Sequence, residues 1–233
     1  MTTEPDDGVY GADMRRTYTR RSDHARYDAQ AINSIIDEAL FCHVGYVDDG
    51  EPIVVPVMHT RIDETLYLHT STGSRLARLS EETEGGTKVC VTVSLLDGLV
   101  LARSQVGHGV NYRSVVIRGK GLLLADGDEK RAVLASLVEH IVAGRSRHSR
   151  PPTAEELAGV GLVRVPLDDV SLKSRTGPPA DEADDLALHH WAGVIGVRNG
   201  YGPAFPSPDL PYDRPVPNQL TNYSRSARPQ GYR

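Results

Sequence analysis

The segment from Leu66 to Arg75 combines side chains that suit a phosphate group. We expect a strand over 65–70, then a Ser-Thr-Gly-Ser-Arg run, then a short helix over 76–80. Hydroxyl groups, an arginine and the free backbone N–H groups of a helix start are donors that hold phosphates in proteins. The segment therefore predicts a mononucleotide phosphate site. An ordinary Ser/Thr-rich turn also fits these residues, because no stringent motif such as a Walker loop is present.

The strand Val54-Val-Pro-Val-Met58 is a second candidate, here for the approach of a flat ligand. It is apolar on both alternating faces, and Pro56 cannot donate to a strand ladder. A proline at such a position is typical of a barrel edge or a bulge, where a ligand can reach exposed backbone. A buried strand with a tolerated edge proline explains the pattern equally well.

The start of another expected strand, Asn111-Tyr-Arg-Ser114, follows the loop Gly107-His-Gly109. An arginine beside an amide, a phenol and a hydroxyl suits a polar ligand edge or a phosphate. Surface strands also commonly begin in this way, so both readings stay open.

Nine histidines raise the question of a metal or haem site. If Asp63-Glu64 is a two-residue turn, Met58 stands opposite His69 and His59 faces the other side of the sheet. A shift of one residue would instead bring His59 opposite His69. No H-x-H or HExxH spacing is present, so we expect no metal site.

Three other observations argue against further classes of site. His189 and His190 precede Trp191, but adjacent side chains diverge on a helix or a strand. Cys42 and Cys90 are far apart, so we expect two buried thiols and neither a disulfide framework nor a zinc site. The absence of a G-x-S-x-G elbow argues against a Ser-His-Asp hydrolase.

The chain of 233 residues has a net charge of −5, which disfavours binding to nucleic acid or to acidic membranes. It contains no apolar run long enough for a membrane span and no signal-peptide core, so we expect a cytoplasmic protein. We divide it into a polar N-terminal arm (1–26), one globular domain (27–197) and a Pro-rich C-terminal tail (198–233).

The domain reads as short strands joined by tight turns, with a few helices. A helix over 28–39, which Asp28 can cap, carries one apolar stripe. It is followed by a hairpin of 41–47 with 52–60 around the turn Asp48-Asp-Gly50. Later elements include helix 128–142, with Asp126 and Glu129 in capping-box spacing, and a second capping box at Thr153 and Glu156. The remaining expected strands are 65–70, 88–96 with a short piece at 100–102, 112–119, 120–125, 161–165 and 170–173. This order favours an antiparallel barrel over a βαβ sheet.

Taken together, these segments resemble a known family. The order FCHVGYVDDGEPIVVPV, LYLHTSTGSR, VCVTVSLLDGLVLARS, NYRSVVIRGKG, SLKSRTGPP and WAGVIGV resembles the pyridoxamine 5′-phosphate oxidase-like flavoproteins with an FMN-binding split barrel, closest to their nitroimidazole-resistance-type bacterial branch. The resemblance covers about residues 21–197. Trp191 is followed by Ala-Gly-Val-Ile-Gly-Val and not by the basic run of true pyridoxamine-phosphate oxidases, so a vitamin B6 substrate is not expected.

The resemblance implies a mixed α/β fold, a six-stranded antiparallel split β-barrel with flanking helices, in a homodimer with FMN at the interface. It implies one candidate catalytic residue, His69, near the flavin. The cofactor-binding residues that it implies are Val54, Val55, Pro56, Val57, Leu68, His69, Ser74, Arg75, Tyr112, Arg113, Ser114 and Trp191.

The expected function is that of an FMN-dependent oxidoreductase that passes a hydride between the flavin and a small molecule. Two alternatives remain open: a flavin carrier or sensor without a substrate, and a haem-binding or haem-degrading split-barrel protein with a histidine ligand. A deazaflavin in place of FMN is a further alternative.

Overall fold

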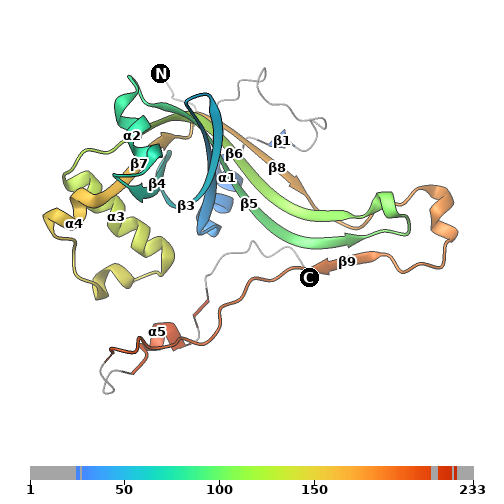
Figure 1. Ribbon diagram of the computed structural model, residues 1–233. Coiled ribbons are helices and arrows are strands. Elements are labelled where there is room, and N and C mark those ends of the chain that lie inside the picture. Colours follow the sequence, from blue (N-terminus) through green and yellow to red (C-terminus); the bar gives the residue numbers. More distant parts are fainter. Residues whose placement is uncertain (1–24, 27, 211–214, 222, 225–233) are drawn as a thin grey trace, which may run out of the picture.

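The computed structural model describes residues 25–26, 28–210, 215–221 and 223–224 (Figure 1). Almost all of the predicted N-terminal arm lies outside the described residues. The strands are β1 (Ala25–Arg26), β2 (Phe41–Asp48), β3 (Glu51–Ile62), β4 (Thr65–Ser71), β5 (Thr87–Leu101), β6 (Gly109–Leu123), β7 (Val160–Pro166), β8 (Asp169–Arg175) and β9 (Gly193–Gly196). The α-helices are α1 (Ala29–Glu38), α2 (Arg75–Glu82), α3 (Asp128–Ile141), α4 (Ala154–Gly159) and α5 (Asn218–Thr221).

Six strands pair around a closed ring, in the order β6, β7, β4, β3, β2 and β5, with β5 returning to β6. Strand β8 adds to the outer edge of β6 and carries β1, while β9 pairs with β5. Every pairing among the described strands is antiparallel. The predicted mixed α/β fold with antiparallel strands is confirmed.

The core of the barrel follows from the alternation of side chains along the strands. In β2 the residues Cys42, Val44 and Tyr46 point inward, while their neighbours point outward. Helix α1 begins at its N-cap Asp28, whose Oδ1 accepts from the N–H of Ala31 at 2.8 Å, as predicted. Its buried stripe closes the core; the stripe is Ile32, Ile35 and Ile36.

Strands β5 and β6 are much longer than the sequence pattern suggested. Each was expected as two pieces, but each is continuous over 15 residues. Together with β8 they leave the barrel as a long curved arm, with β9 along one edge (Figure 1). A bulge interrupts β5 inside this arm, because the partners of Leu96 and Gly98 are the consecutive residues Tyr112 and Asn111. Asp97 is therefore the extra residue.

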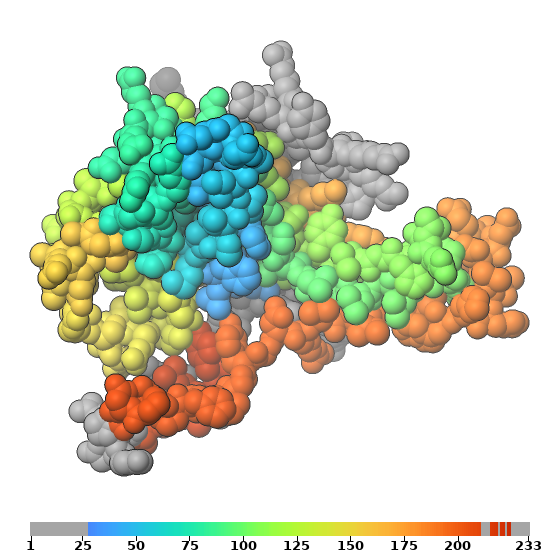
Figure 2. All heavy atoms as spheres, viewed as in Figure 1, coloured from blue at the N-terminus to red at the C-terminus, as the bar shows by residue number. Residues whose placement is uncertain are grey.

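The chain turns back at the outer end of the arm, between β8 and β9 (Figure 1). After β9 it continues in the same direction as an extended segment beneath the barrel body toward α5 (Figure 2). Residues 200–210 are exposed throughout. Tyr223 ties this segment to the body, because its hydroxyl donates to the carbonyl of Ile141 at 2.7 Å.

Two local expectations are wrong. The predicted capping box of Asp126 and Glu129 does not form: Gly127 occupies the N-cap position of α3 without a side-chain cap, and Asp126 instead pairs with Lys130 at 2.7 Å. Cys90 is exposed and not buried. Cys42 is buried as expected, and this burial raises the pKa of its thiol to about 12.

Candidate functional site

The predicted ligand strand, β3, presents an apolar strip on the outer face of the barrel. The hairpin turn before it uses Asp49 and Gly50 at φ values of 48° and 84°, and so sets the register of β2 with β3. On the outer face Val54 is 67% exposed, and Pro56 and Met58 are also exposed. Val55 and Val57 alternate to the other face, where they pack partly against the core. Only half of the predicted strand can therefore present side chains to a ligand on the outer face.

His69 shares the outer face with this strip. Strands β3 and β4 pair with His59 opposite Leu68, so Asp63-Glu64 is a two-residue turn and the alternative register is wrong. Both His59 and Leu68 are fully buried, and the ring of His59 donates from Nε2 to the carbonyl of Ile36 at 2.9 Å. Alternation directs Met58 and His69 to the opposite, outer side. Partial burial lowers the pKa of His69 below its ordinary value.

The predicted phosphate turn is already bonded within the protein. Ser74 is the N-cap of α2: its Oγ accepts from the N–H of Ala77 at 3.1 Å and from the hydroxyl of Thr70 at 2.8 Å. Arg75 donates from Nε to Asp48 at 2.7 Å, and it also lies 3.6 Å from Asp49. The hydrogen bond from Arg75 lowers the pKa of Asp48, so that carboxylate stays charged at neutral pH. One guanidinium therefore faces two carboxylates.

Arg113, predicted to contact a ligand, is held by two acids. It bonds Asp97 through Nε and Nη2, each at 2.8 Å, and Glu38 through Nη1 at 2.7 Å. These bonds raise its pKa further above the already high value of arginine. Ser114 donates to the carbonyl of Lys173 at 3.2 Å, and Tyr112 lies half-buried at the start of the arm. This cluster joins α1 to the arm.

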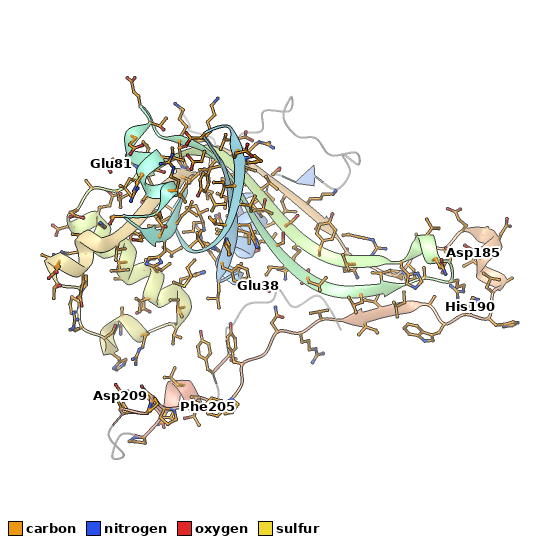
Figure 3. The ribbon with its side chains drawn as sticks, in the orientation of Figure 1. Glu38, Glu81, Asp185, His190, Phe205 and Asp209 are labelled. Carbon is orange, nitrogen blue, oxygen red and sulfur yellow. The ribbon has the colours of Figure 1, made fainter. Side chains whose placement is uncertain are left out.

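Trp191 does not meet β3 within one chain. It is 68% exposed and follows His190, which Figure 3 places at the outer end of the arm, far from Glu38 at the barrel end. Its ring lies against Gly193: a Cβ on that glycine would come within 2.7 Å of the indole. The structure thus brings together the β3 strip and His69, and leaves Trp191 apart.

A groove that the sequence did not reveal lies beside the strip. It encloses about 590 Å³ on the outer face of β2, β3, β5 and β6, a size typical of small-molecule sites. Its walls are largely apolar, and its far side carries Lys88, Arg118 and Lys120 together with Asp169, which pairs with Arg118. Cross-strand register was needed to find it, because Lys88 stands 30 residues before Arg118 and 32 before Lys120, and becomes their neighbour only through the pairing of β5 with β6.

Two findings on the described parts of the chain concern metal binding and membrane insertion. There, no group of three or more His, Cys, Asp or Glu side chains is placed to hold a metal ion. No helix among these residues is long and apolar enough to cross a membrane.

Comparison with known proteins decides the family. The sequence profile described as pyridoxamine 5′-phosphate oxidase matches residues 28–174, which is most of the chain. The chain belongs to this family. No curated protein matches the chain.

Solved structures of this pyridoxamine 5′-phosphate oxidase family share the fold. The flavocytochrome Anf3 from Azotobacter vinelandii is 34% identical with a TM-score of 0.84, over 92% of this chain and 99% of that one. An FAD and heme binding protein from Mycobacterium smegmatis is 31% identical with a TM-score of 0.80, over 85% and 98% of the two chains. A putative 5-nitroimidazole antibiotic resistance protein from Bacteroides thetaiotaomicron is 29% identical with a TM-score of 0.53, over 64% and 85%.

Proposed function

We propose that this member of the pyridoxamine 5′-phosphate oxidase family binds a flavin nucleotide along β3 and acts as an oxidoreductase on a small molecule. The observation that supports this most directly is the exposed apolar strip of Val54, Pro56 and Met58 with His69 on the same face. A flat ring laid on this strip would remove apolar surface from water. FMN is the flavin implied by the sequence, and the Mycobacterium smegmatis neighbour is described as binding FAD.

The side chains of the strip suit a flavin. A bound flavin supplies the hydride chemistry; the protein supplies binding, orientation and exclusion of water. Val54 and Met58 present apolar side chains that exclude water, and the backbone nitrogen of Pro56 itself carries no N–H that needs a partner. His69, half-buried and with a lowered pKa, is neutral in most molecules at neutral pH and can exchange a proton with a substrate there.

The split-barrel homodimer expected from the sequence forms part of this proposal. The separation of Trp191 from β3 supports it, because a flavin that touches both requires a second copy of the chain. Apolar side chains exposed along the arm, including Leu99 and Ile195, give this second copy a surface to cover.

Purified protein should carry or take up flavin at one per chain, seen as absorbance near the flavin bands and as fluorescence released on denaturation. Oxidation of a reduced nicotinamide with an added acceptor then separates an enzyme from a flavin carrier or sensor. Absence of binding to riboflavin, FMN and FAD alike would refute the proposal, and binding without any turnover would leave the carrier reading in its place.

Haem binding is a second candidate, because the two neighbours above 30% identity are described as a flavocytochrome and as an FAD and heme binding protein. This chain offers possible nitrogen ligands for it. His43 on β2 and His69 on β4 lie on either side of β3, and both point to the outer face. A Soret band on haem titration that is lost in His43→Ala or His69→Ala supports this candidate; an unchanged spectrum in both variants excludes these two ligands.

A further inference from the structure

One face of strand β5 runs without a break from the outer-face groove to the arm. Cys90 lines the groove, and Leu96 and Leu99 are exposed further along the strand. All three lie on the same face, because their partners on β6 all have even numbers. Ile195 of β9 stands directly opposite Leu99 and is 51% exposed. The groove therefore continues into the apolar side of the arm.

The indole of Trp191 lies on this face at the outer end of the arm. Gly193 stands opposite Leu101, two residues beyond Leu99, so a side chain on Gly193 would point to the same face. A Cβ there would come within 2.7 Å of the indole, which therefore covers that position. Figure 3 shows the neighbouring residue His190 at the outer end of the arm. The exposed face thus begins at the groove and ends at Trp191.

The outer end of the arm is both acidic and apolar. We call residues 182–191 the arm tip. Its three carboxylates are those of Glu182, Asp184 and Asp185. Within the described residues none of them has an ion-pair partner, and with both histidines neutral the formal charge of the tip is −3. Leu186 and Trp191 in the tip are 59% and 68% exposed. Apolar side chains that gather on a surface with a polar rim are typical of a protein contact.

The groove has the complementary charge. Lys88 and Lys120 stand directly opposite each other on β5 and β6, and both are exposed. Neither lysine has an ion-pair partner in the described parts of the chain. The third cation, Arg118, is compensated by Asp169, which also lines the groove, at 3.1 Å. With Asp169 counted, the lining carries a net charge of +2. Like charges that face each other across two strands destabilise a sheet, so a nearby carboxylate would stabilise the lysine pair.

The arm tip cannot fill the groove of its own chain. Cys90 in the groove and Leu101 near the tip are 11 residues apart on one continuous strand, which is about 35 Å at the rise of an extended strand. A second copy placed antiparallel across a two-fold axis removes this limit, because each tip then lies over the groove of the other chain. The axis would pass near Leu96 and Leu99, which would meet their own copies, as in the self-complementary contact of a two-fold dimer.

We infer that the arm tip of each protomer docks in the groove of the other, with the tip carboxylates facing Lys88 and Lys120 and the apolar side chains of the tip against the groove walls. This inference rests on the homodimer of the proposed function and names the two surfaces that form it. In this arrangement Trp191 approaches the β3 strip of the other chain, because Val54 belongs to both the strip and the groove.

Charge reversal on the two surfaces tests the contact. The groove variant is Lys88→Glu with Lys120→Glu, and the tip variant is Asp184→Lys with Asp185→Lys. Each variant alone places like charges at both contacts of the dimer, so its dimer dissociation constant, measured by sedimentation, should rise by about 10-fold or more. In an equimolar mixture the acidic groove of one variant meets the basic tip of the other. The mixture should therefore form a heterodimer, which also shows that both variants are folded.

The matched control is Arg145→Glu with Arg147→Glu. These exposed arginines lie in the turn after α3, on the side of the barrel away from the arm (Figure 1), and the change in charge equals that of the groove variant. The dimer dissociation constant of the control should change by no more than about 2-fold, as expected for screened, distant charges.

Two further measurements address the contact directly. The wild-type dimer should weaken as the salt concentration rises, because salt screens the attraction between the tip and the groove. A thiol reagent should label Cys90 more slowly in the wild-type dimer than in either variant alone, because the docked tip covers the groove.

The outcomes separate this inference from the proposed function. Variants that each dimerise as tightly as the wild-type protein, or a mixture that stays monomeric, overturn the docking while flavin binding stands. A wild-type dimer that salt does not weaken has the same consequence. A wild-type protein that is monomeric at micromolar concentration refutes the docking together with the homodimer. If the wild-type dimer binds none of riboflavin, FMN and FAD but the two variants pair as expected, the flavin proposal fails and the docking stands.

Discussion

Arg113 and Asp97 form a two-pronged ion pair, with both N–H···O distances at 2.8 Å, and Asp97 can reach the guanidinium because it is the extra residue of the β5 bulge. The acid side chain is almost fully buried, and the third partner, Glu38, stands at the last position of α1. Arg113 thereby ties the first helix to the strands that form the arm.

Arg113→Ala should therefore reduce stability and not ligand binding alone. Removing one partner from a buried ion pair costs about 3 kcal/mol or more, because the two carboxylates remain without their cation. Urea unfolding measures this change. Arg118→Ala is the control on the same strand; its partly exposed pair with Asp169 should cost about 1 kcal/mol or less. If Arg113→Ala instead kept its stability and bound flavin more weakly, this arginine would be a flavin ligand.

His69→Gln should separate binding from turnover. The glutamine keeps a polar side chain but cannot donate a proton as an imidazolium, so flavin affinity should hold while reduction or reoxidation by substrate slows by about 100-fold. Stopped-flow measurement of the flavin absorbance gives the rate, and fluorescence titration gives the affinity. Joint loss of flavin and thermal stability would show that His69 is structural.

The same histidine predicts a pH dependence. Burial favours the neutral imidazole, so the pKa of His69 lies below its ordinary value of about 6.5. If the protonated form is the acid, the rate should be highest at low pH and fall as pH rises through that lowered pKa. The profile of His69→Gln should lack this step. A wild-type profile that rises over the same range would show that the neutral imidazole acts instead, as a base.

The two cysteines should differ in reactivity. Cys90 lies exposed in the groove, whereas Cys42 is buried with its pKa raised to about 12 and holds almost no thiolate at neutral pH. A thiol reagent should therefore modify one group per native chain and two after unfolding, and Cys90→Ser should abolish the native reaction. Rapid labelling of both thiols in the native protein would contradict the burial of Cys42.

The oligomeric state can be tested on the arm. Wild-type protein should sediment as a dimer at micromolar concentration, and Ile195→Asp should shift it toward the monomer, because Ile195 is half exposed on the edge strand β9. Ala132→Asp, which adds the same charge on the exposed side of α3, is the control. A wild-type monomer that still binds flavin tightly would argue against the homodimer.

The local elements were predictable because short-range physics determines them. Asp28 before an apolar stripe, the Asp49-Gly50 turn and the Thr153 capping box each appear where the pattern indicated. The lengths of β5 and β6 were not, because their continuation depends on pairing with each other and with β8, which no local pattern encodes.

At the candidate site, residue types predicted contacts with a ligand, whereas in the folded chain the same side chains bond other parts of the protein. A run rich in hydroxyls before an arginine predicts phosphate binding, but Arg75 meets Asp48 from a turn 27 residues away, and Ser74 caps its own helix. No local pattern singled out Lys88 and Lys120, because they become neighbours only through the pairing of β5 with β6. The sequence left two registers of β3 with β4 open, and the pairing of His59 with Leu68 decides for the one that turns His69 to the outer face.

The β5 bulge also reverses the parity of the strand. Before it the odd-numbered residues Val91 and Val93 are buried, and after it the even-numbered Val100 is buried while Leu99 is exposed. The partners of these residues on β6 keep one parity throughout, because Val93 pairs with Val115 and Val100 with Gly109. The inserted residue therefore lets the barrel and the arm bury the same face of a single continuous ribbon. Deleting Asp97 would leave Leu96 and Gly98 paired with the same two residues of β6, so Val100 would stay on the buried face and Leu99 on the exposed one. The deletion would instead remove the carboxylate that holds Arg113. The insertion therefore adds an acidic side chain at this position without changing the face with which the arm meets other molecules.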